Sequence, residues 1–218
     1  YVKVFHGSSS GLPDSANRKL VSSRPGSYGC SMSCVGDING DGYADVVIGA
    51  NEHEGGGKAF VYYGSDSGLA ATEAWSLTAG QIRAYLGSSV RCAGDVNGDG
   101  YSDLIVGAGS YTVDQNKEGV AYLYYGSPMG LSESEETSME SDQTEANFGY
   151  GVASAGDVNG DGYSDVVVGA PDYDNGESDE GRAFVFLGGQ GGLAPDAAWT
   201  AEPDQAGAHF GASVSAAG

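Results

Sequence analysis

The sequence predicts an all-β chain built from repeated four-stranded sheets. The first observation is an internal repeat: an acidic ten-residue string occurs three times, beginning at Gly36, Gly94 and Gly156, roughly 60 residues apart. The second is a set of short, glycine-bounded apolar runs rich in β-branched and aromatic residues, which is typical of strands. The third is that we find no amphipathic helix of useful length. These features favour a β-propeller segment over a β-solenoid, whose repeats are usually shorter.

Four strands are expected in each unit, and the third copy shows them well. Residues 151–156 carry small side chains, which suit a crowded propeller axis. Residues 165–168 form a β-branched run and 183–187 an aromatic and aliphatic run, so both are expected to be buried on two faces. The fourth strand is more polar and suits an outer rim; it is expected at 198–200 here and at 74–77 in the first copy. Polar, glycine-rich connectors separate the second and third strands, at 51–57, 109–119 and 171–181.

The repeat also predicts the division of the chain. Three complete blades are expected, at 28–85, 86–147 and 148–209. Residues 1–27 resemble the back half of an earlier blade, and residues 210–218 resemble the first strand of a later one. We therefore expect the chain to be an excerpt of a longer array. Residues 1–6 lack the charged start and apolar middle of a signal peptide.

Composition limits the partners. The chain has 9 basic and 30 acidic residues, a formal charge of −21. This charge disfavours nucleic acid and anionic lipid headgroups, since both are polyanionic. No stretch approaches the ~18 consecutive apolar residues of a membrane-spanning helix, so no membrane insertion is expected. The acidic balance instead favours cations or simple solubility.

The acidic string has the spacing of a calcium loop. Numbered from its first Asp, it carries side-chain oxygens at positions 1, 3, 5 and 9, with a glycine at position 6 that lets the backbone curl round an ion. The backbone carbonyl at position 7 is expected to point inward as a further ligand. Three Ca²⁺ sites are predicted, with these residues in order: Asp37, Asn39, Asp41, Tyr43, Asp45; Asp95, Asn97, Asp99, Tyr101, Asp103; Asp157, Asn159, Asp161, Tyr163, Asp165.

Other interpretations of the string are weaker. An EF-hand needs a ligand at position 12 and a following helix, but position 12 is Ile48, Val106 or Val168 inside an apolar strand. Zinc favours Cys and His ligands, which the string lacks, and magnesium demands stricter octahedral geometry. An Asx-turn without metal is the remaining structural alternative.

The segment 148–171 resembles an FG-GAP repeat. It combines Phe-Gly, the acidic string and Val-Gly-Ala-Pro, and the same pattern covers essentially the whole chain. Tyr28 and Leu86 replace the Phe in the other copies, and Asn51 and Gly109 replace the Pro. The resemblance implies a β-propeller of the integrin α-subunit head type, usually seven-bladed, with calcium in the loop joining strands one and two. It also implies that the opposite face carries the ligands.

These expectations lead to a function. We expect a calcium-stabilised, secreted or cell-surface scaffold with a structural or adhesive role, which presents loops to a protein or glycan partner. The candidate loops vary between copies: 52–54, 111–118, 172–180 and the acidic run 133–145. A lectin-like propeller and a filament subunit that joins copies of itself through open blade edges are the alternatives. No recurring catalytic constellation is found, so no enzyme is expected.

The remaining side chains have structural expectations. His53, between two glutamates, is expected in a solvated loop, with a surface metal site as the alternative. Cys30, Cys34 and Cys92 are expected to be buried free thiols, although a bridge between Cys34 and Cys92 is possible. Trp75 and Trp199 occupy matching places and are expected to pack against the blade rather than bind sugars.

Overall fold

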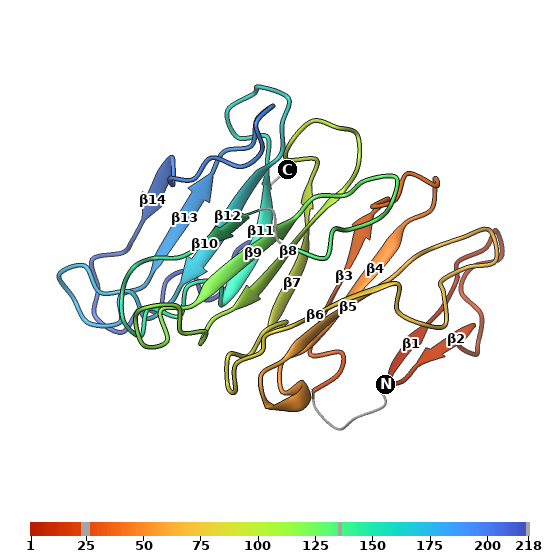
Figure 1. Ribbon diagram of the computed structural model, residues 1–218, viewed down its shortest axis with the longest axis horizontal. Coiled ribbons are helices and arrows are strands. Elements are labelled where there is room, and N and C mark those ends of the chain that lie inside the picture. Colours follow the sequence, from red (N-terminus) through yellow and green to blue (C-terminus); the bar gives the residue numbers. More distant parts are fainter. Residues whose placement is uncertain (23–26, 135–136, 217–218) are drawn as a thin grey trace.

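The computed structural model describes residues 1–22, 27–134 and 137–216. The chain folds into three four-stranded antiparallel sheets and one two-stranded sheet (Figure 1). The two-stranded sheet pairs β1 (Val2–Val4) with β2 (Arg18–Leu20). The first four-stranded sheet comprises β3 (Ser31–Gly36), β4 (Asp45–Ala50), β5 (Lys58–Tyr62) and β6 (Trp75–Thr78). The second sheet comprises β7 (Ser89–Gly94), β8 (Asp103–Ala108), β9 (Val120–Tyr124) and β10 (Thr137–Met139). The third comprises β11 (Gly151–Gly156), β12 (Asp165–Ala170), β13 (Arg182–Phe186) and β14 (Trp199–Ala201).

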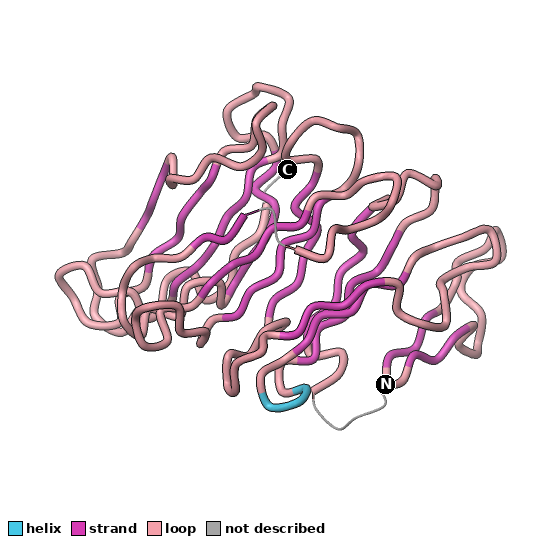
Figure 2. Tube along the Cα trace, viewed as in Figure 1, coloured by secondary structure: helices cyan, strands magenta, loops and turns pink. Residues whose placement is uncertain are grey.

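Each sheet is an up-and-down meander in which sequence neighbours pair (Figure 2). The ladders have the same register in all three sheets; Cys34 pairs with Val46 in the first, and Cys92 pairs with Leu104 in the second. In each sheet the pairing of strands one and two shifts by one residue just before the acidic loop, so that Gly36 faces Asp45. Such a bulge bends the strand, and it turns the chain into the loop.

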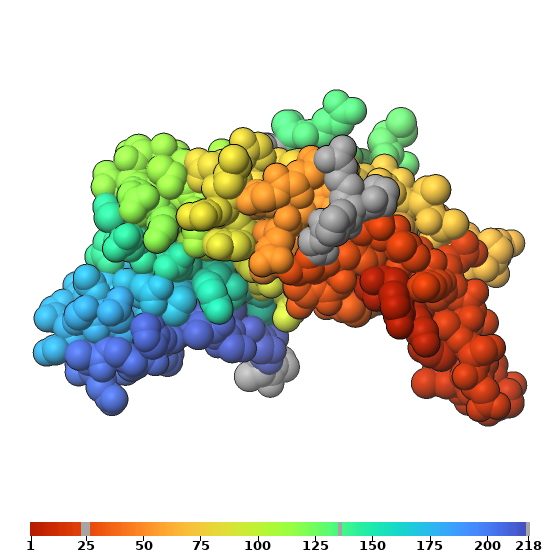
Figure 3. Space-filling view, turned by 90° about the horizontal axis from the view of Figure 1, so that it is seen from below, coloured from red at the N-terminus to blue at the C-terminus, as the bar shows by residue number. Residues whose placement is uncertain are grey.

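The sheets pack face to face in sequence order, as propeller blades do. The strands β3, β7 and β11 lie next to one another, so the first strand of every blade is the inner one. One apolar core lies between the first and second blades and another between the second and third, built mainly from strands two and three. A smaller core joins the first blade to the β1–β2 segment, which lies at one end of the molecule (Figure 3).

Contacts between the blades repeat as well. A parallel bridge joins the end of each connector to the start of the next blade, at Gly57 and Leu86, Gly119 and Phe148, and Gly181 and Phe210. A glutamine side chain in the linker between blades makes two hydrogen bonds to the backbone of the next connector. Gln81 does so with Thr112, at 3.0 and 2.8 Å, and Gln143 with Asp174, at 2.8 and 2.6 Å. These bonds fix the connector face of one blade to that of the next.

The fold confirms the all-β propeller architecture and corrects several local expectations. The acidic run 133–145 is not only a loop, since it contains β10; its residues 135–136 lie outside the described part of the chain. His53 is buried in the short 3₁₀ helix His53–Gly55, edge-on to Phe60 at 5.5 Å between ring centroids, rather than solvated. Aromatic packing removes this ring from water.

The cysteines and one tryptophan also differ from expectation. All three thiols are free, but Cys30 and Cys34 are exposed and Cys92 is half-buried. Trp75 packs as predicted, 4.8 Å from the Tyr124 ring of the second blade. Trp199 is 56% exposed, because no described segment covers its side of the third blade as the second blade covers Trp75. None of the described helices is long or apolar enough to cross a membrane.

Candidate metal centre

The three acidic strings form the loops between strands one and two of the three blades. They run from β3 to β4, from β7 to β8 and from β11 to β12. The inner strand delivers the first Asp, and the buried second strand begins with the last one. Glycines with positive φ at positions 4 and 6, such as Gly98 (φ 75°) and Gly100 (φ 90°), close the curve between them. Twelve of the fifteen predicted site residues lie in these loops, and the other three, Asp45, Asp103 and Asp165, are the first residues of β4, β8 and β12.

Within each loop the first Asp organises the backbone. Oδ1 of Asp95 accepts hydrogen bonds from the N–H groups of Gly98 (2.7 Å) and Asp99 (3.1 Å), and its Oδ2 accepts one from Gly100 (2.9 Å). The Asn97 amide donates to Oδ2 of Asp99 at 2.9 Å. The other two loops repeat these bonds with Asp37 and Asp157. The polar side chains therefore face inward over a curled backbone.

The last Asp of each loop is a buried carboxylate. Asp45, Asp103 and Asp165 are each 0% exposed. Asp103 accepts two hydrogen bonds, from the N–H groups of Val96 (2.8 Å) and Gly126 (2.9 Å). No ion pair in the described part of the chain involves any of the three. A buried carboxylate without a cationic partner is unfavourable.

The pKa values show this penalty. Burial raises the pKa of Asp103 to about 7, although its two N–H donors oppose the rise and repulsion from Asp99 and Asp95 adds to it. Burial likewise raises the pKa of Asp45, with smaller contributions from Asp41 and Asp37. A bound divalent cation would offset both the burial and the repulsion.

Neighbouring loops stack on one another. A Cβ atom added to Gly40 would lie 2.5 Å from the Tyr101 ring, and one added to Gly98 would lie 2.5 Å from the Tyr163 ring. Backbone bonds tie the same loops together: the Ser102 N–H donates to the Asp37 carbonyl at 3.0 Å, and the Ser164 N–H to that of Asp95 at 2.9 Å. The position-7 tyrosine of one loop therefore covers the loop before it.

The loops have the donors that calcium prefers, but the carboxylate oxygens of one loop lie further apart than those of a compact metal site. Their side-chain donors are all carboxylate or amide oxygens, the hard ligands typical of Ca²⁺. The three carboxylates of one loop do not bring one oxygen each within 4.8 Å of the others; among the described residues, those of Asp114, Glu118 and Asp142 do. The oxygen donors of the loops, and the buried last Asp that has hydrogen bonds but no ion-pair partner among the described residues, fit a divalent cation.

Two buried glutamates were missed at the sequence level. Glu118 and Glu180 are 0% exposed, although both lie in polar, glycine-rich connectors. The signal available was their position, since each directly precedes the glycine that begins the third-strand run, Gly119 or Gly181. The first blade has Gly56 in this place.

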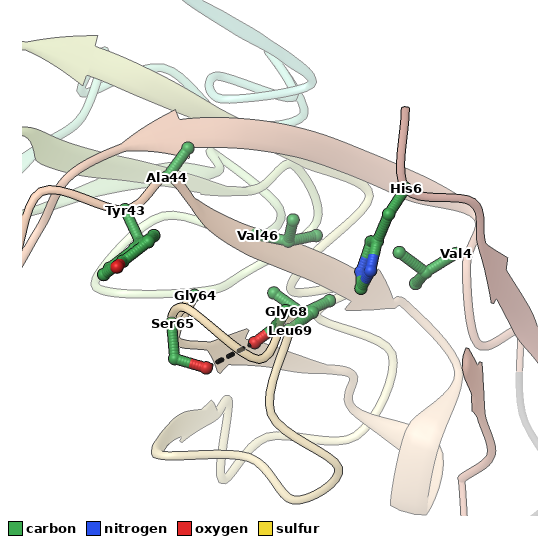
Figure 4. A pocket seen from close by; sticks show the side chains of 9 residues that line it. All are labelled: Val4, His6, Tyr43, Ala44, Val46, Gly64, Ser65, Gly68 and Leu69. Carbon is green, nitrogen blue, oxygen red and sulfur yellow. Dashed lines mark hydrogen bonds between the residues drawn. The ribbon is translucent and has the colours of Figure 1, made fainter. Parts of the chain in front are cut away.

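His6 has a packing role. In the shallow pocket between the N-terminal segment and the first blade, its ring lies over Gly68, close to Val4 (Figure 4). Tyr63 and Tyr125 occupy the equivalent place and lie over Gly130 and Gly192 of the following blades. The repeated contact places residues 1–7 against the first blade as one blade lies against the next.

Known proteins share this pattern over most of the chain. The family described as FG-GAP repeat matches residues 92–124 and 148–186, and an FG-GAP-like repeat matches residues 37–106. Integrin alpha-4 of Xenopus laevis is 33% identical over 157 residues, and integrin alpha-PS2 of Drosophila melanogaster is 36% identical over 163. Phosphatidylinositol-glycan-specific phospholipase D of Bos taurus is 36% identical over 167 residues.

The match is to one part of each relative. The alignments cover 71%, 70% and 70% of this chain but only 14%, 11% and 20% of the respective relatives. The family matches together cover residues 37–124 and 148–186, which include all three acidic loops. Each blade has a Tyr-Gly, Leu-Gly or Phe-Gly pair before its inner strand and Gly-Ala at the end of its second strand. With these matches, the chain belongs to the FG-GAP repeat family, as an integrin-alpha-type β-propeller segment.

Proposed function

We propose that the three acidic loops bind Ca²⁺ and that the chain is a calcium-stabilised scaffold. The observation that carries this proposal is the last Asp of each loop, fully buried and without a basic partner at the same place in three blades. Because this unfavourable burial of a carboxylate recurs in three blades, we infer a common cationic partner that the described residues do not supply. The alternate oxygens of the loop identify that partner as a hard divalent cation.

Calcium would act on stability rather than chemistry. A site at one to ten times its Kd contributes ~0.4–1.4 kcal/mol to the folded state, so three sites matter to a marginal domain. Because adjacent loops stack through Tyr101 and Tyr163, an ion in one loop would also order the surface on which its neighbour rests. The expected role is a rigid scaffold.

The scaffold would present the connectors of the opposite face to a protein partner. Antiparallel strands place these connectors at the far ends of the sheets from the acidic loops. The glutamine bonds of Gln81 and Gln143 hold the connectors in fixed positions, while their sequences differ from blade to blade. A fixed frame with variable loops supports recognition.

The location and the activity belong to the same proposal. Extracellular calcium modules bind with Kd of ~10⁻⁴–10⁻³ M, which suits calcium outside the cell. We therefore place the chain in a secreted or cell-surface protein with an adhesive, non-enzymatic role. The glycan-binding and filament alternatives stay predictions.

The experiment is a thermal melt with and without calcium. We expect EGTA to lower the melting temperature and added Ca²⁺, but not Na⁺ at equal ionic strength, to restore it. Identical melting curves, together with no calcium in elemental analysis, would overturn the proposal.

A further inference from the structure

A second kind of acidic site lies on the connector face of the second blade. Asp114 and Glu118 belong to the connector between β8 and β9, and Asp142 to the linker that follows β10. One carboxylate oxygen from each lies within 4.8 Å of the other two. The linker runs along the connector, because the N–H groups of Glu145 and Phe148 donate to the carbonyls of Asn116 (2.7 Å) and Glu118 (2.8 Å).

The buried member of this cluster has an unsatisfied oxygen. Glu118 is 0% exposed, and its Oε1 accepts three backbone hydrogen bonds, from Val113 (2.6 Å), Asp114 (2.9 Å) and Gln115 (3.3 Å). Its Oε2 is buried and has no donor among the described residues. Leaving a buried acceptor unpaired is unfavourable, and more so when the acceptor is charged. The backbone therefore holds one oxygen of Glu118 and leaves the other unpaired, on a buried side chain that belongs to the carboxylate cluster.

The surrounding charges intensify the need for a cation. Lys117, the basic residue of this connector, is directed to Glu145 at 3.9 Å. Glu140, two residues before Asp142, adds a fourth acidic group to this part of the chain.

The third blade provides an internal comparison. Glu180 matches Glu118 and also has an unpaired Oε2, but Gly176 stands in the place of Asp114. Arg182, in the place of Val120, forms an ion pair with Glu202, the counterpart of Glu140. Among the described residues, the second blade alone combines the buried glutamate with two carboxylates within 4.8 Å, and it has Val120 where the third blade has Arg182.

We propose that Asp114, Glu118 and Asp142 form a fourth divalent-cation site, distinct from the acidic loops. Carboxylates alone favour a hard ion such as Ca²⁺. Because the ligands come from the connector of the second blade and the linker to the third, the ion fastens one blade to the next on the connector face. The proposed scaffold function does not depend on it.

The test counts bound ions in the EGTA-stripped chain after equilibrium dialysis against about 10 mM Ca²⁺, well above the Kd of ~10⁻⁴–10⁻³ M typical of extracellular modules. We expect four ions in the wild type and three in Glu118→Gln. Asp142→Asn is the safer second variant, because Asp142 is exposed with φ 53°, which asparagine adopts readily, and it also lowers the count to three. The matched control, Glu180→Gln, keeps four.

The outcomes separate the two proposals. Three ions in the wild type and in both variants would overturn the fourth site and leave the loop sites standing. An ion that is lost in Glu118→Gln and Asp142→Asn but kept in Asp161→Asn would support the fourth site and count against that loop. Loss of an ion in Glu180→Gln as well would contradict the argument that Glu118 needs its two carboxylate neighbours.

Discussion

Replacing the buried carboxylate of the middle loop with its neutral isostere should make the stability of the chain less dependent on calcium. Asp103→Asn keeps the size of the side chain and one acceptor oxygen. In the folded chain both oxygens of Asp103 accept an N–H group, from Val96 and Gly126. The amide therefore keeps one of these bonds, loses the other and removes the negative charge.

The expected magnitude differs with and without the ion. With calcium, the variant loses a charged ligand; at about 10 mM Ca²⁺ and a Kd of ~10⁻⁴–10⁻³ M, an intact site contributes ~1.4–2.7 kcal/mol to the free energy of unfolding. In EGTA, the lost hydrogen bond, worth ~1.5–3 kcal/mol to a charged group, is opposed by relief of a buried charge that Asp99 and Asp95 repel. The penalty of the substitution should thus be greater with calcium by ~1–3 kcal/mol.

The assay is chemical denaturation at pH 7.5 of wild type and variant, each in calcium and in EGTA. Asp204→Asn controls for the change in net charge, because it removes an exposed carboxylate from the linker after β14, which hydrogen-bonds to the connector 171–181 and not to the acidic loops. An equal penalty in both buffers would refute the reasoning, because it would make the loop a self-sufficient Asx-turn.

Three further predictions rest on other contacts. Gly98→Ala should lower the free energy of unfolding by at least ~1 kcal/mol more than Gly160→Ala, because both have positive φ but only the first would strike a tyrosine ring; equal losses in urea denaturation would argue against loop stacking. Trp75→Ala should cost ~2–4 kcal/mol and Trp199→Ala about 0.5 or less, given their packing and exposure; similar shifts in melting temperature would contradict this. Burial raises the pKa of Tyr28, so the folded state holds that proton more tightly than the unfolded state, and this contribution to stability is present below pH ~10 and lost above it. Tyr28→Phe should therefore lose less stability than the wild type between about pH 9 and 11; parallel pH profiles would refute it.

The framework of the fold was predictable because the same physical pattern recurs three times. The β-branched run at 165–168 predicts a strand buried on both faces, and β12 is buried throughout its length. Small side chains predict the inner position of β11, which lies beside β7. Both predictions depend only on local composition, and the repeat removes the ambiguity of a single short run.

Departures arise where the outcome depends on a neighbour distant in sequence. Trp75 and Trp199 have similar local sequences, but within the described part of the chain only Trp75 has another blade packed against it. His53 lies between two glutamates, yet its burial follows from contact with Phe60. β10 lies in an acidic run whose own composition disfavours a strand; pairing with β9 supplies the missing stabilisation.

The candidate sites divide in the same way. Side-chain oxygens at alternate positions and a glycine, all within nine residues, predict the acidic loops. Their position between the first and second strands of each blade therefore follows from the sequence. The Asp114, Glu118 and Asp142 cluster joins two segments more than twenty residues apart and depends on the burial of Glu118, which only the fold determines.

The central claim is that each acidic loop holds a hard divalent ion that offsets its buried carboxylate. The most direct measurement is the anomalous scattering of crystals grown in calcium. We predict a peak within each of the loops 37–45, 95–103 and 157–165, in contact with oxygens of positions 1, 3, 5, 7 and 9. Loops without peaks, their aspartates bonded only to backbone N–H groups, would contradict the account.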